Sequence, residues 1–341
     1  GRKRTPMNAL VCLFVCLSVC LSNVIFTKFV TFTTHHLTGV WLKTVITMKF
    51  ELSTASIHSS LANPAQVSDS IRGQIVFNYQ PYFAGINRGT AAAAIALNES
   101  HTILVDSRFV HYGTFDERDI FAEKIGEFSG NEVALGVAYA YTIESKNLRV
   151  GARLNLISST LADYQSMGWT ADLGLYHESQ SSLYRYALVA RNIGSQFITY
   201  DNVKESIPFS LSFGISNELE YLPLRWHLSL DYLNRWDLAY VNTNKQQTDF
   251  EGELVDDSPT FIDELVRHLV FGAELFPDRP FSIQVGYNFL RSAELSISEI
   301  RSFSGLSFGF GVNLRKFKFN YSHARFSAAG NTNFLGITFV P

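Results

Sequence analysis

The sequence predicts an all-β fold, a transmembrane antiparallel barrel of about 14 strands. Three observations carry this prediction. The composition is that of a membrane protein without helical spans, a two-residue hydrophobic period recurs along the chain, and the connections between the periodic segments alternate between short and long.

The composition separates this chain from ordinary soluble domains. Charged residues make up 17% of the 341 residues, whereas an average soluble domain has roughly 25%. Aromatic residues reach 14%, yet the mean hydropathy is only +0.05. Beyond the N-terminal segment, the sequence has no apolar run of the roughly 18 residues that a membrane-spanning helix needs. Strands that turn alternate residues to lipid and to a lumen produce this combination, because half of their positions stay polar.

The period-2 pattern is clearest at 306–314, where Leu, Phe, Phe, Val and Leu alternate with Ser, Gly, Gly and Asn. The segments 281–289 and 150–156 repeat it. Further strands are predicted at 71–83, 91–99, 101–112, 131–143, 167–177, 184–194, 209–219, 225–236, 266–276, 317–326 and 332–340. Each has about the length that a tilted membrane strand needs.

Loop lengths distinguish a membrane barrel from a soluble sandwich, which would also alternate. Connections near 99–100, 144–147, 180–183, 221–224, 278–280 and 315–316 are short, whereas those near 113–130, 195–208, 237–265 and 293–304 are long. Short periplasmic turns and long outer loops are typical of bacterial outer-membrane barrels. We therefore expect a multi-pass barrel in the cell outer membrane. Aromatic residues at strand ends are candidates for its interfacial girdles: Tyr82, Phe83, Tyr139, Tyr141, Trp169, Tyr176, Trp226, Trp236, Tyr287 and Phe289.

The predicted organisation has three parts: residues 1–47, a plug remnant at 48–70 and a barrel at 71–340. Residues 2–4 are basic and an apolar stretch follows, which is the order of an export signal. The same stretch contains a repeated Val-Cys-Leu unit, the kind of sequence that translation of repetitive DNA produces, in which case Met48 is nearer the true start. Both interpretations stay open.

Several chemistries are not expected. The net charge of −3 and the absence of a basic stripe argue against a nucleic-acid partner. The three cysteines lie at 12, 16 and 20, and the nine histidines include no i,i+4 pair. No nucleophile elbow is present. The acidic run 249–257 lacks the spacing of a calcium loop. We expect no enzyme activity, cofactor or metal site.

A short helix is predicted after Ser258-Pro259, with Phe261, Ile262, Leu265 and Val266 on one stripe. It ends the longest irregular segment, and long loops with their own helix are usually functional or disordered. Candidate partner-contact residues on this outer rim are Trp236, Tyr240, Phe261, Ile262, Leu265 and Val266. Alternatively, the helix caps the lumen or touches lipid.

Several segments resemble the FadL-like barrels, and within them the PorQ family of the Bacteroidota type IX secretion system. Asn63-Pro64-Ala65, ahead of the first strand, is similar to the plug element of FadL-type proteins. The segments 207–209, 219–225 and 233–238 resemble PorQ motifs in order and spacing. The match is extended by 191–194, 263–268, 272–275, 286–288 and 329–333, so the resemblance covers about residues 61–340.

The resemblance implies a fourteen-stranded barrel that acts without catalysis. Its implied role is to anchor PorZ at the cell surface, in an attachment complex with PorU and PorV homologues that transfers cargo to lipopolysaccharide. An alternative is a FadL-like transporter of hydrophobic small molecules through the outer membrane. The expected lumen face, with Arg153 and Asp172 among Gly, Ser and Asn, is polar, and that does not favour transport because ligand sites are mostly apolar.

Overall fold

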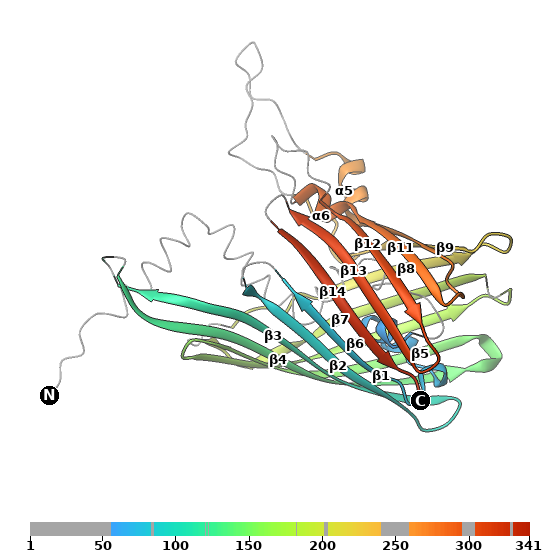
Figure 1. Ribbon diagram of the computed structural model, residues 1–341, viewed down its shortest axis with the longest axis horizontal. Helices are drawn as coiled ribbons and strands as arrows, with labels where there is room; N and C mark the ends of the chain where they lie inside the picture. The colour runs from blue at the N-terminus through green and yellow to red at the C-terminus, as the bar shows by residue number, and fades with distance from the viewer. Residues whose placement is uncertain are drawn as a thin grey trace, which may run out of the picture.

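Fourteen antiparallel strands form one closed barrel in the computed structural model (Figure 1). The structure describes residues 56–82, 85–119, 121, 123–181, 183–200, 204–239, 259–294, 304–327 and 330–341. Sequence neighbours pair throughout, and β1 closes the ring on β14, where Ile75 faces Phe339. The predictions for residues 1–55, including the export signal and Met48, lie outside the described residues.

The strands lie close to their predicted positions. Their bounds are β1 Ile75–Pro81, β2 Asn87–Ala96, β3 His101–Arg118, β4 Lys124–Ile143, β5 Leu148–Leu161, β6 Tyr164–Glu178, β7 Tyr184–Ile198, β8 Ser210–Glu218, β9 Leu224–Leu230, β10 Leu269–Leu275, β11 Phe281–Asn288, β12 Leu306–Asn313, β13 Phe317–Ser327 and β14 Gly330–Phe339. The helices are α4 Ile57–Ala62, α5 Phe261–His268 and α6 Phe289–Glu294, with 3-10 turns η2 Pro64–Gln66, η3 Asp69–Ile71 and η5 Glu144–Lys146.

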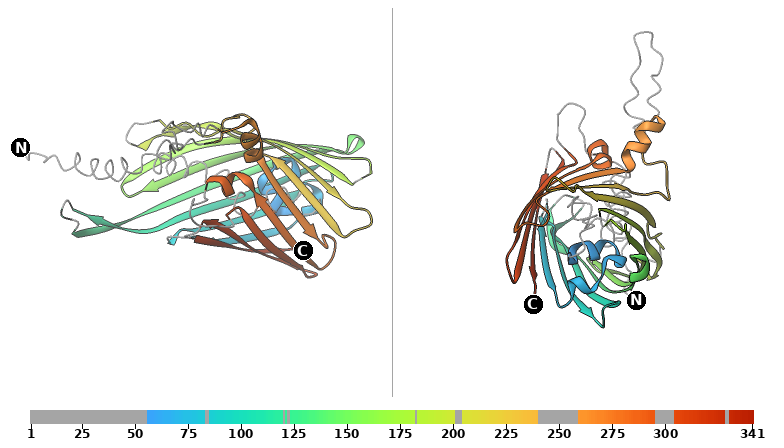
Figure 2. Two further views of the ribbon diagram at one scale, coloured as in Figure 1. Left: turned by 90° about the horizontal axis from the view of Figure 1, so that it is seen from above. Right: turned by 90° about the vertical axis from the view of Figure 1, so that its right-hand side faces the viewer.

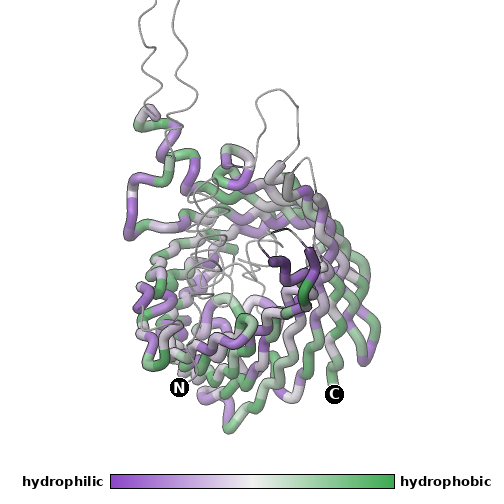
Figure 3. Tube along the Cα trace, turned by 90° about the vertical axis from the view of Figure 1, so that its left-hand side faces the viewer, coloured by the Kyte–Doolittle hydropathy of each residue, from purple (hydrophilic) through white to green (hydrophobic). Residues whose placement is uncertain are grey.

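Alternation along each strand divides lipid face from lumen face. In β11, Phe281, Ile283 and Val285 point outward, whereas Ser282 and Gln284 are buried inside. The outer surface therefore carries large exposed apolar side chains all round the barrel, as a lipid-facing wall requires. Figure 3 shows hydrophobic and hydrophilic residues interleaved around the ring. In the part of the chain that the structure describes, no helix is long and apolar enough to cross a membrane.

The two barrel ends differ. At the turn end, defined by the connections 97–100, 144–147, 179–183, 219–223, 276–280 and 314–316, the links are short. At the opposite loop end, β9 and β10 are joined by residues 231–268, which include α5, and α6 follows β11. Figure 1 shows α5 and α6 together at this end.

Two sequence predictions are wrong. Residues 113–130 are not a long loop, because β3 and β4 continue as a projecting hairpin that begins at a register shift beside Gly113, whose φ is +82°. The period-2 signal fades there, so sequence alone ended the strands early. Tyr82 and Tyr176 are not girdle residues, because both are buried on the lumen side. Phe83 lies outside the described residues.

Candidate functional site

A plug made of α4, η2 and η3 lies inside the barrel, as the right-hand view of Figure 2 shows. Short polar side chains shape it. Ser56 caps α4 by accepting a hydrogen bond from the His58 amide, and Asn63 caps η2 by accepting one from the Ala65 amide at 2.9 Å. Pro64 occupies the first position of η2, where its missing amide hydrogen costs nothing. The predicted plug element thus forms a tight turn.

This turn sits directly against two strand glycines. A Cβ added to Gly174 of β6 would lie 1.9 Å from Asn63 Oδ1, and one added to Gly151 of β5 would lie 2.3 Å from the Pro64 carbonyl carbon. Asn63 Nδ2 also donates to the Leu175 carbonyl at 3.2 Å. Only strands without side chains at these two positions allow so close an approach, so the barrel wall is shaped to receive the plug.

Arg153 fastens the end of α4 to the wall. Its guanidinium donates to the Leu61 carbonyl at 2.7 Å and to the Ser60 carbonyl at 3.3 Å. The same group pairs with Asp106 at 3.1 Å, and Asp106 also pairs with Arg108 at 2.8 Å. All three charged side chains are buried, so the pairing offsets a desolvation cost that isolated charges could not bear.

The opposite face of the plug is apolar. Ile57 and Leu61, one helical turn apart on α4, pack with Val67 and Ile71 of the plug. The wall completes this cluster with small and aliphatic residues of β1 to β4: Val76, Ala92, Ala94, Leu104, Ala138 and Ala140. The plug is therefore held by hydrophobic burial on one side and by hydrogen bonds on the other.

His58 lies between the plug and strands β13 and β14. Its Nε2 is 3.2 Å from Asn320 Nδ2 and 3.3 Å from Thr338 Oγ1, and its ring meets Phe334 edge-on. Burial and the positive charge of Lys318 lower the pKa of His58 to about 4. The seated plug therefore holds a neutral histidine at pH 7.

The lumen is less uniformly polar than the sequence predicts. Arg153 and Asp172 do face inward, as expected. Toward the loop end, however, Ala62 of the plug packs into an apolar belt on the wall. This lumen belt consists of Tyr82, Ile86, Val110, Tyr112 and Ala134, with Ile157 beside it.

The outer-rim helix α5 begins at a capping box between Thr260 and Asp263, two residues later than the Ser258-Pro259 start predicted. Phe261 and Ile262 are each 68% exposed, and Leu265 is 37% exposed. Val266 is half-buried, and Tyr240 lies outside the described residues. The Trp236 ring stacks on Phe261 at 5.0 Å and on His268 at 5.1 Å. The structure thus brings four of the six candidate contact residues into one exposed cluster.

Buried polar contacts connect this cluster to the neighbouring segment. The Glu264 carboxylate accepts hydrogen bonds from the Leu238 amide at 2.9 Å and from the Ala239 amide at 3.0 Å. His268 contacts the carbonyl oxygens of Asp231 and Trp236. The segment 231–239 is thereby tied to α5, although neither Glu264 nor His268 is distinctive in the sequence.

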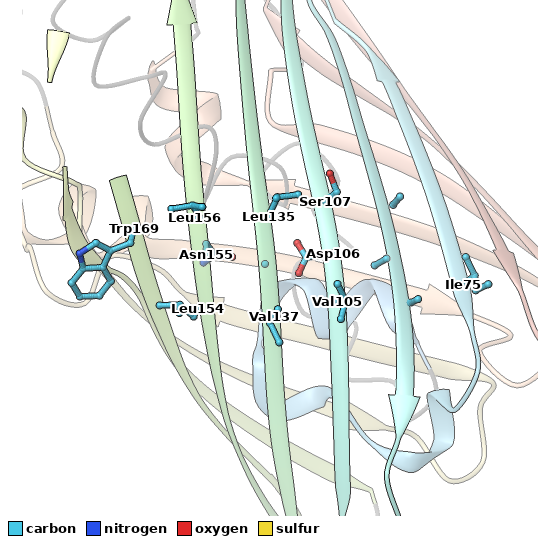
Figure 4. A pocket seen from close by; sticks show the side chains of 14 residues that line it. Ile75, Val105, Asp106, Ser107, Leu135, Val137, Leu154, Asn155, Leu156 and Trp169 are labelled. Carbon is cyan, nitrogen blue, oxygen red and sulfur yellow. The ribbon is translucent and has the colours of Figure 1, made fainter. Parts of the chain in front are cut away.

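A shallow groove of about 630 Å³ lies across strands β1 to β6. Figure 4 shows its lining, which is mostly outward-facing: Ile75, Val105, Leu135, Val137, Leu154, Leu156 and Trp169, with alanines 91–93 of β2 between them. Small side chains on β2 beside larger ones on its neighbours produce the depression. The groove belongs to the lipid-facing wall. Among the described residues, no group of histidine, cysteine and carboxylate side chains could hold a metal ion.

The fold can be compared with solved structures. The chain is similar to the Pseudomonas putida toluene transporter TodX, with a TM-score of 0.51 and 10% identity over 86% of this chain and 95% of TodX. A Pseudomonas aeruginosa FadL homologue matches with a TM-score of 0.47 and 8% identity, covering 84% of this chain and 94% of that one. The likeness to TodX shows the fold, a closed outer-membrane barrel of fourteen antiparallel strands.

The Ralstonia pickettii toluene transporter TbuX matches this chain with a TM-score of 0.46 and 12% identity, over 83% of this chain and 92% of TbuX. No protein-family model and no curated protein matches the sequence. At these identities the likeness is one of fold, so function has to be argued from this chain's own residues.

Sequence reasoning identified the plug turn and the rim helix but missed what holds them. Gly151 and Gly174 are two of 22 glycines, and only the three-dimensional seat distinguishes them. Arg153 carried a usable signal, because a charged residue at a lumen-facing strand position needs a partner. That partner, a pair of carbonyl oxygens on α4, leaves no trace in the sequence pattern.

Proposed function

We propose that this barrel transports small hydrophobic molecules across the outer membrane, with the plug as its gate. The observation that carries the proposal is the lumen belt, which puts two tyrosines and aliphatic side chains directly on the loop-end side of the plug. A molecule entering from outside meets this apolar wall before it meets Ala62. The likeness of fold to the toluene transporter TodX supports the proposal.

The test is uptake by cells that lack the gene and carry either wild-type or variant protein. Val110→Thr adds a hydroxyl to the lumen belt with little change in volume. Val105→Thr makes the same change on the lipid face of the same strand, β3. We expect uptake of a small aromatic hydrocarbon such as toluene to fall severalfold for the first variant and to match wild type for the second. Equal uptake by the gene-deleted and complemented cells would refute transport.

A second candidate function is the attachment role implied by the PorQ resemblance, in which the barrel anchors a PorZ-like protein together with PorU and PorV homologues and lipopolysaccharide. The favouring observation is the rim cluster of Trp236, Phe261, Ile262 and Leu265, because exposed aromatic and aliphatic side chains on a rigid support resemble interface anchors.

Replacing both Phe261 and Leu265 by Asp tests this role. We expect normal barrel abundance with loss of the partner from the cell surface, measured by mass spectrometry of proteins that co-purify from detergent-solubilised outer membrane. Tyr221→Asp, at an aromatic residue 90% exposed in the opposite turn end, is the matched control. Retention of the partner by the double variant would refute this placement.

Deleting the gene separates the two functions. Impaired hydrocarbon uptake with normal cargo secretion favours transport, whereas lost surface attachment of cargo with normal uptake favours the anchoring role.

A further inference from the structure

Arg88 of β2 is a buried charge without a hydrogen bond. Its side chain is 0% exposed, and none of its three guanidinium nitrogens has a hydrogen bond. The guanidinium lies over the Tyr82 ring, 4.6 Å from the centroid, and within the described part of the chain it makes no ion pair. Burying an unpaired guanidinium costs several kcal/mol, on the order of the desolvation penalty of one ion. Such a group is expected where something else supplies the missing acceptors.

A second unsatisfied group lies at the same level of the lumen. Arg88 pairs in register with Val110 of β3, which pairs with Glu132 of β4, so the three lie side by side and face inward. Two strand spacings put the Cα atoms of Arg88 and Glu132 roughly 10 Å apart. Glu132 Oε1 accepts a hydrogen bond from Ser159 at 3.2 Å, whereas the buried Oε2, with the Tyr112 side chain beside it, makes no hydrogen bond of ordinary geometry.

The two groups differ in the hydrogen-bonding partner that each can take. Arg88 offers a planar fork of donors, which suits the two oxygens of a carboxylate. Glu132 Oε2 offers an acceptor, which suits an ammonium group. Between them lie Val110 and, on its loop-end side, Tyr112, both in the lumen belt. This wall would accommodate an apolar or aromatic substituent.

We propose that Arg88 and Glu132 form a binding site for a small zwitterion of the α-amino acid type with an apolar or aromatic side chain. The carboxylate binds Arg88 and the ammonium binds Glu132. A simple carboxylate leaves Glu132 unsatisfied and a simple amine leaves Arg88 unpaired, so each half-ligand loses one charge-assisted contact. The site goes beyond the proposed transport function, and its occupancy does not depend on passage through the barrel.

The experiment is isothermal titration calorimetry on the full-length barrel purified in detergent. The probes are L-phenylalanine, 3-phenylpropionate without the ammonium, and phenethylamine without the carboxylate. We expect L-phenylalanine to bind at least about tenfold more tightly than either half-ligand, since one lost charge-assisted contact corresponds to about 1.5–3 kcal/mol. No heat with any probe, or equal affinity for L-phenylalanine and 3-phenylpropionate, would overturn the proposal.

Two variants assign the contacts. Arg88→Gln should weaken L-phenylalanine and 3-phenylpropionate alike, whereas Glu132→Gln should weaken L-phenylalanine and leave 3-phenylpropionate unchanged. Arg279→Gln, in the turn between β10 and β11, is the control. Heat-modifiable migration on gels establishes that each variant is folded. Unchanged L-phenylalanine affinity in folded Arg88→Gln protein would overturn the site, and binding in wild type without hydrocarbon uptake would leave the site standing while transport fails.

Discussion

Two levels of the lumen differ in whether their buried charged side chains are paired. Beside the plug, Arg153, Asp106 and Arg108 form a continuous network that ends on carbonyl oxygens of α4. Four residues further along β3, roughly 13 Å toward the loop end, Arg88 and Glu132 face the lumen with free hydrogen-bonding atoms. The same strands supply both levels, so the difference lies in what each level has to hold.

The comparison separates structural charges from charges available to a ligand. A paired buried charge stabilises a contact within the protein, and removing one partner leaves the other uncompensated. A buried charge without a hydrogen bond costs desolvation energy, and Arg88 offsets part of that cost through its contact with the Tyr82 ring, so removing it should not destabilise the fold. The paired level therefore belongs to the plug seat, and the unpaired level is where we place ligand binding.

Filling the plug seat should have the largest effect. Gly174→Ala puts a methyl group 1.9 Å from Asn63 Oδ1 and 3.0 Å from the Ala65 amide, so the turn has to leave its position. We expect single-channel conductance in planar bilayers to rise severalfold, and a cysteine placed at Ser60 to react with a water-soluble maleimide that does not label the seated plug.

Gly130→Ala is the matched control on a lumen-facing strand position. Its added methyl group meets only the side-chain atoms of Leu161 and Tyr112, at 3.1 Å, and these can move aside. A Gly174→Ala barrel with wild-type conductance and an unreactive Ser60→Cys would mean that the plug is not seated by this close approach.

Removing a paired charge should cost more than removing an unpaired one. Arg153→Met deprives Asp106 and two α4 carbonyl oxygens of their donor, which is expected to destabilise the plugged barrel by about 3–5 kcal/mol. Arg88→Met removes a charge that has no hydrogen bond or ion pair within the described residues. It loses the contact with the Tyr82 ring but also removes the cost of burying the charge, so it should not lower the stability.

Thermal unfolding followed by heat-modifiable migration measures both variants. Arg191→Met is a further control, because Arg191 is buried and donates to Ser212 of the wall at 2.9 Å. It should lower stability without raising amide hydrogen exchange in α4. Equal losses for Arg153→Met and Arg88→Met would break the distinction between the two levels.

Acid should loosen the plug through His58. The seated side chain has a pKa of about 4, whereas a released histidine has its ordinary value near 6.5. A group whose pKa is lowered in the seated state favours that state at high pH, and the advantage is lost as pH falls from 6.5 to 4. At pH 5 these values weaken seating by about 30-fold, or roughly 2 kcal/mol.

Conductance or maleimide labelling of Ser60→Cys, measured from pH 7.5 to 5, gives this dependence. Lys318 is the charged group that acts on His58, and Asn320 and Thr338 are its uncharged neighbours. His58→Leu should abolish the change over this range. A variant that keeps the full pH response would assign it to other groups.

Much of the fold could be predicted because the strands of a membrane barrel alternate between lipid-facing and lumen-facing side chains, which gives a two-residue hydrophobic period. The segment at 306–314 coincides almost residue for residue with β12. The prediction failed where individual residues depart from this hydrophobic alternation. Gly113 breaks the alternation in β3, and the tyrosines at 82 and 176 face inward because each supports a buried arginine, Arg88 and Arg149, through its ring.

The site was harder to predict than the fold. Asn63-Pro64-Ala65 was recognisable as a cap and turn, but its seat depends on two glycines on neighbouring strands more than 85 residues away. Strand register brings Arg88, Val110 and Glu132 together, and register follows from pairing partners rather than from any local pattern. Without knowing which strands pair, the sequence can identify such residues one by one but cannot show that they lie side by side.

The smallest effect is expected at the loop end, where the rim cluster stands apart from both lumen levels. Glu264 ties segment 231–239 to α5 through the Leu238 and Ala239 amides, so Glu264→Ala leaves two amide hydrogens without an acceptor while the barrel below keeps all its contacts. A charge-assisted hydrogen bond contributes about 1.5–3 kcal/mol. We expect hydrogen exchange at Leu238 and Ala239 to rise at least tenfold, with unchanged barrel melting and conductance.

Glu264→Gln, which retains one acceptor oxygen, should give an intermediate rise. If Glu264→Ala also lowered barrel melting, the rim cluster would be part of the barrel's stability, and partner or lipid contacts at Phe261 and Ile262 could no longer be varied independently of the fold.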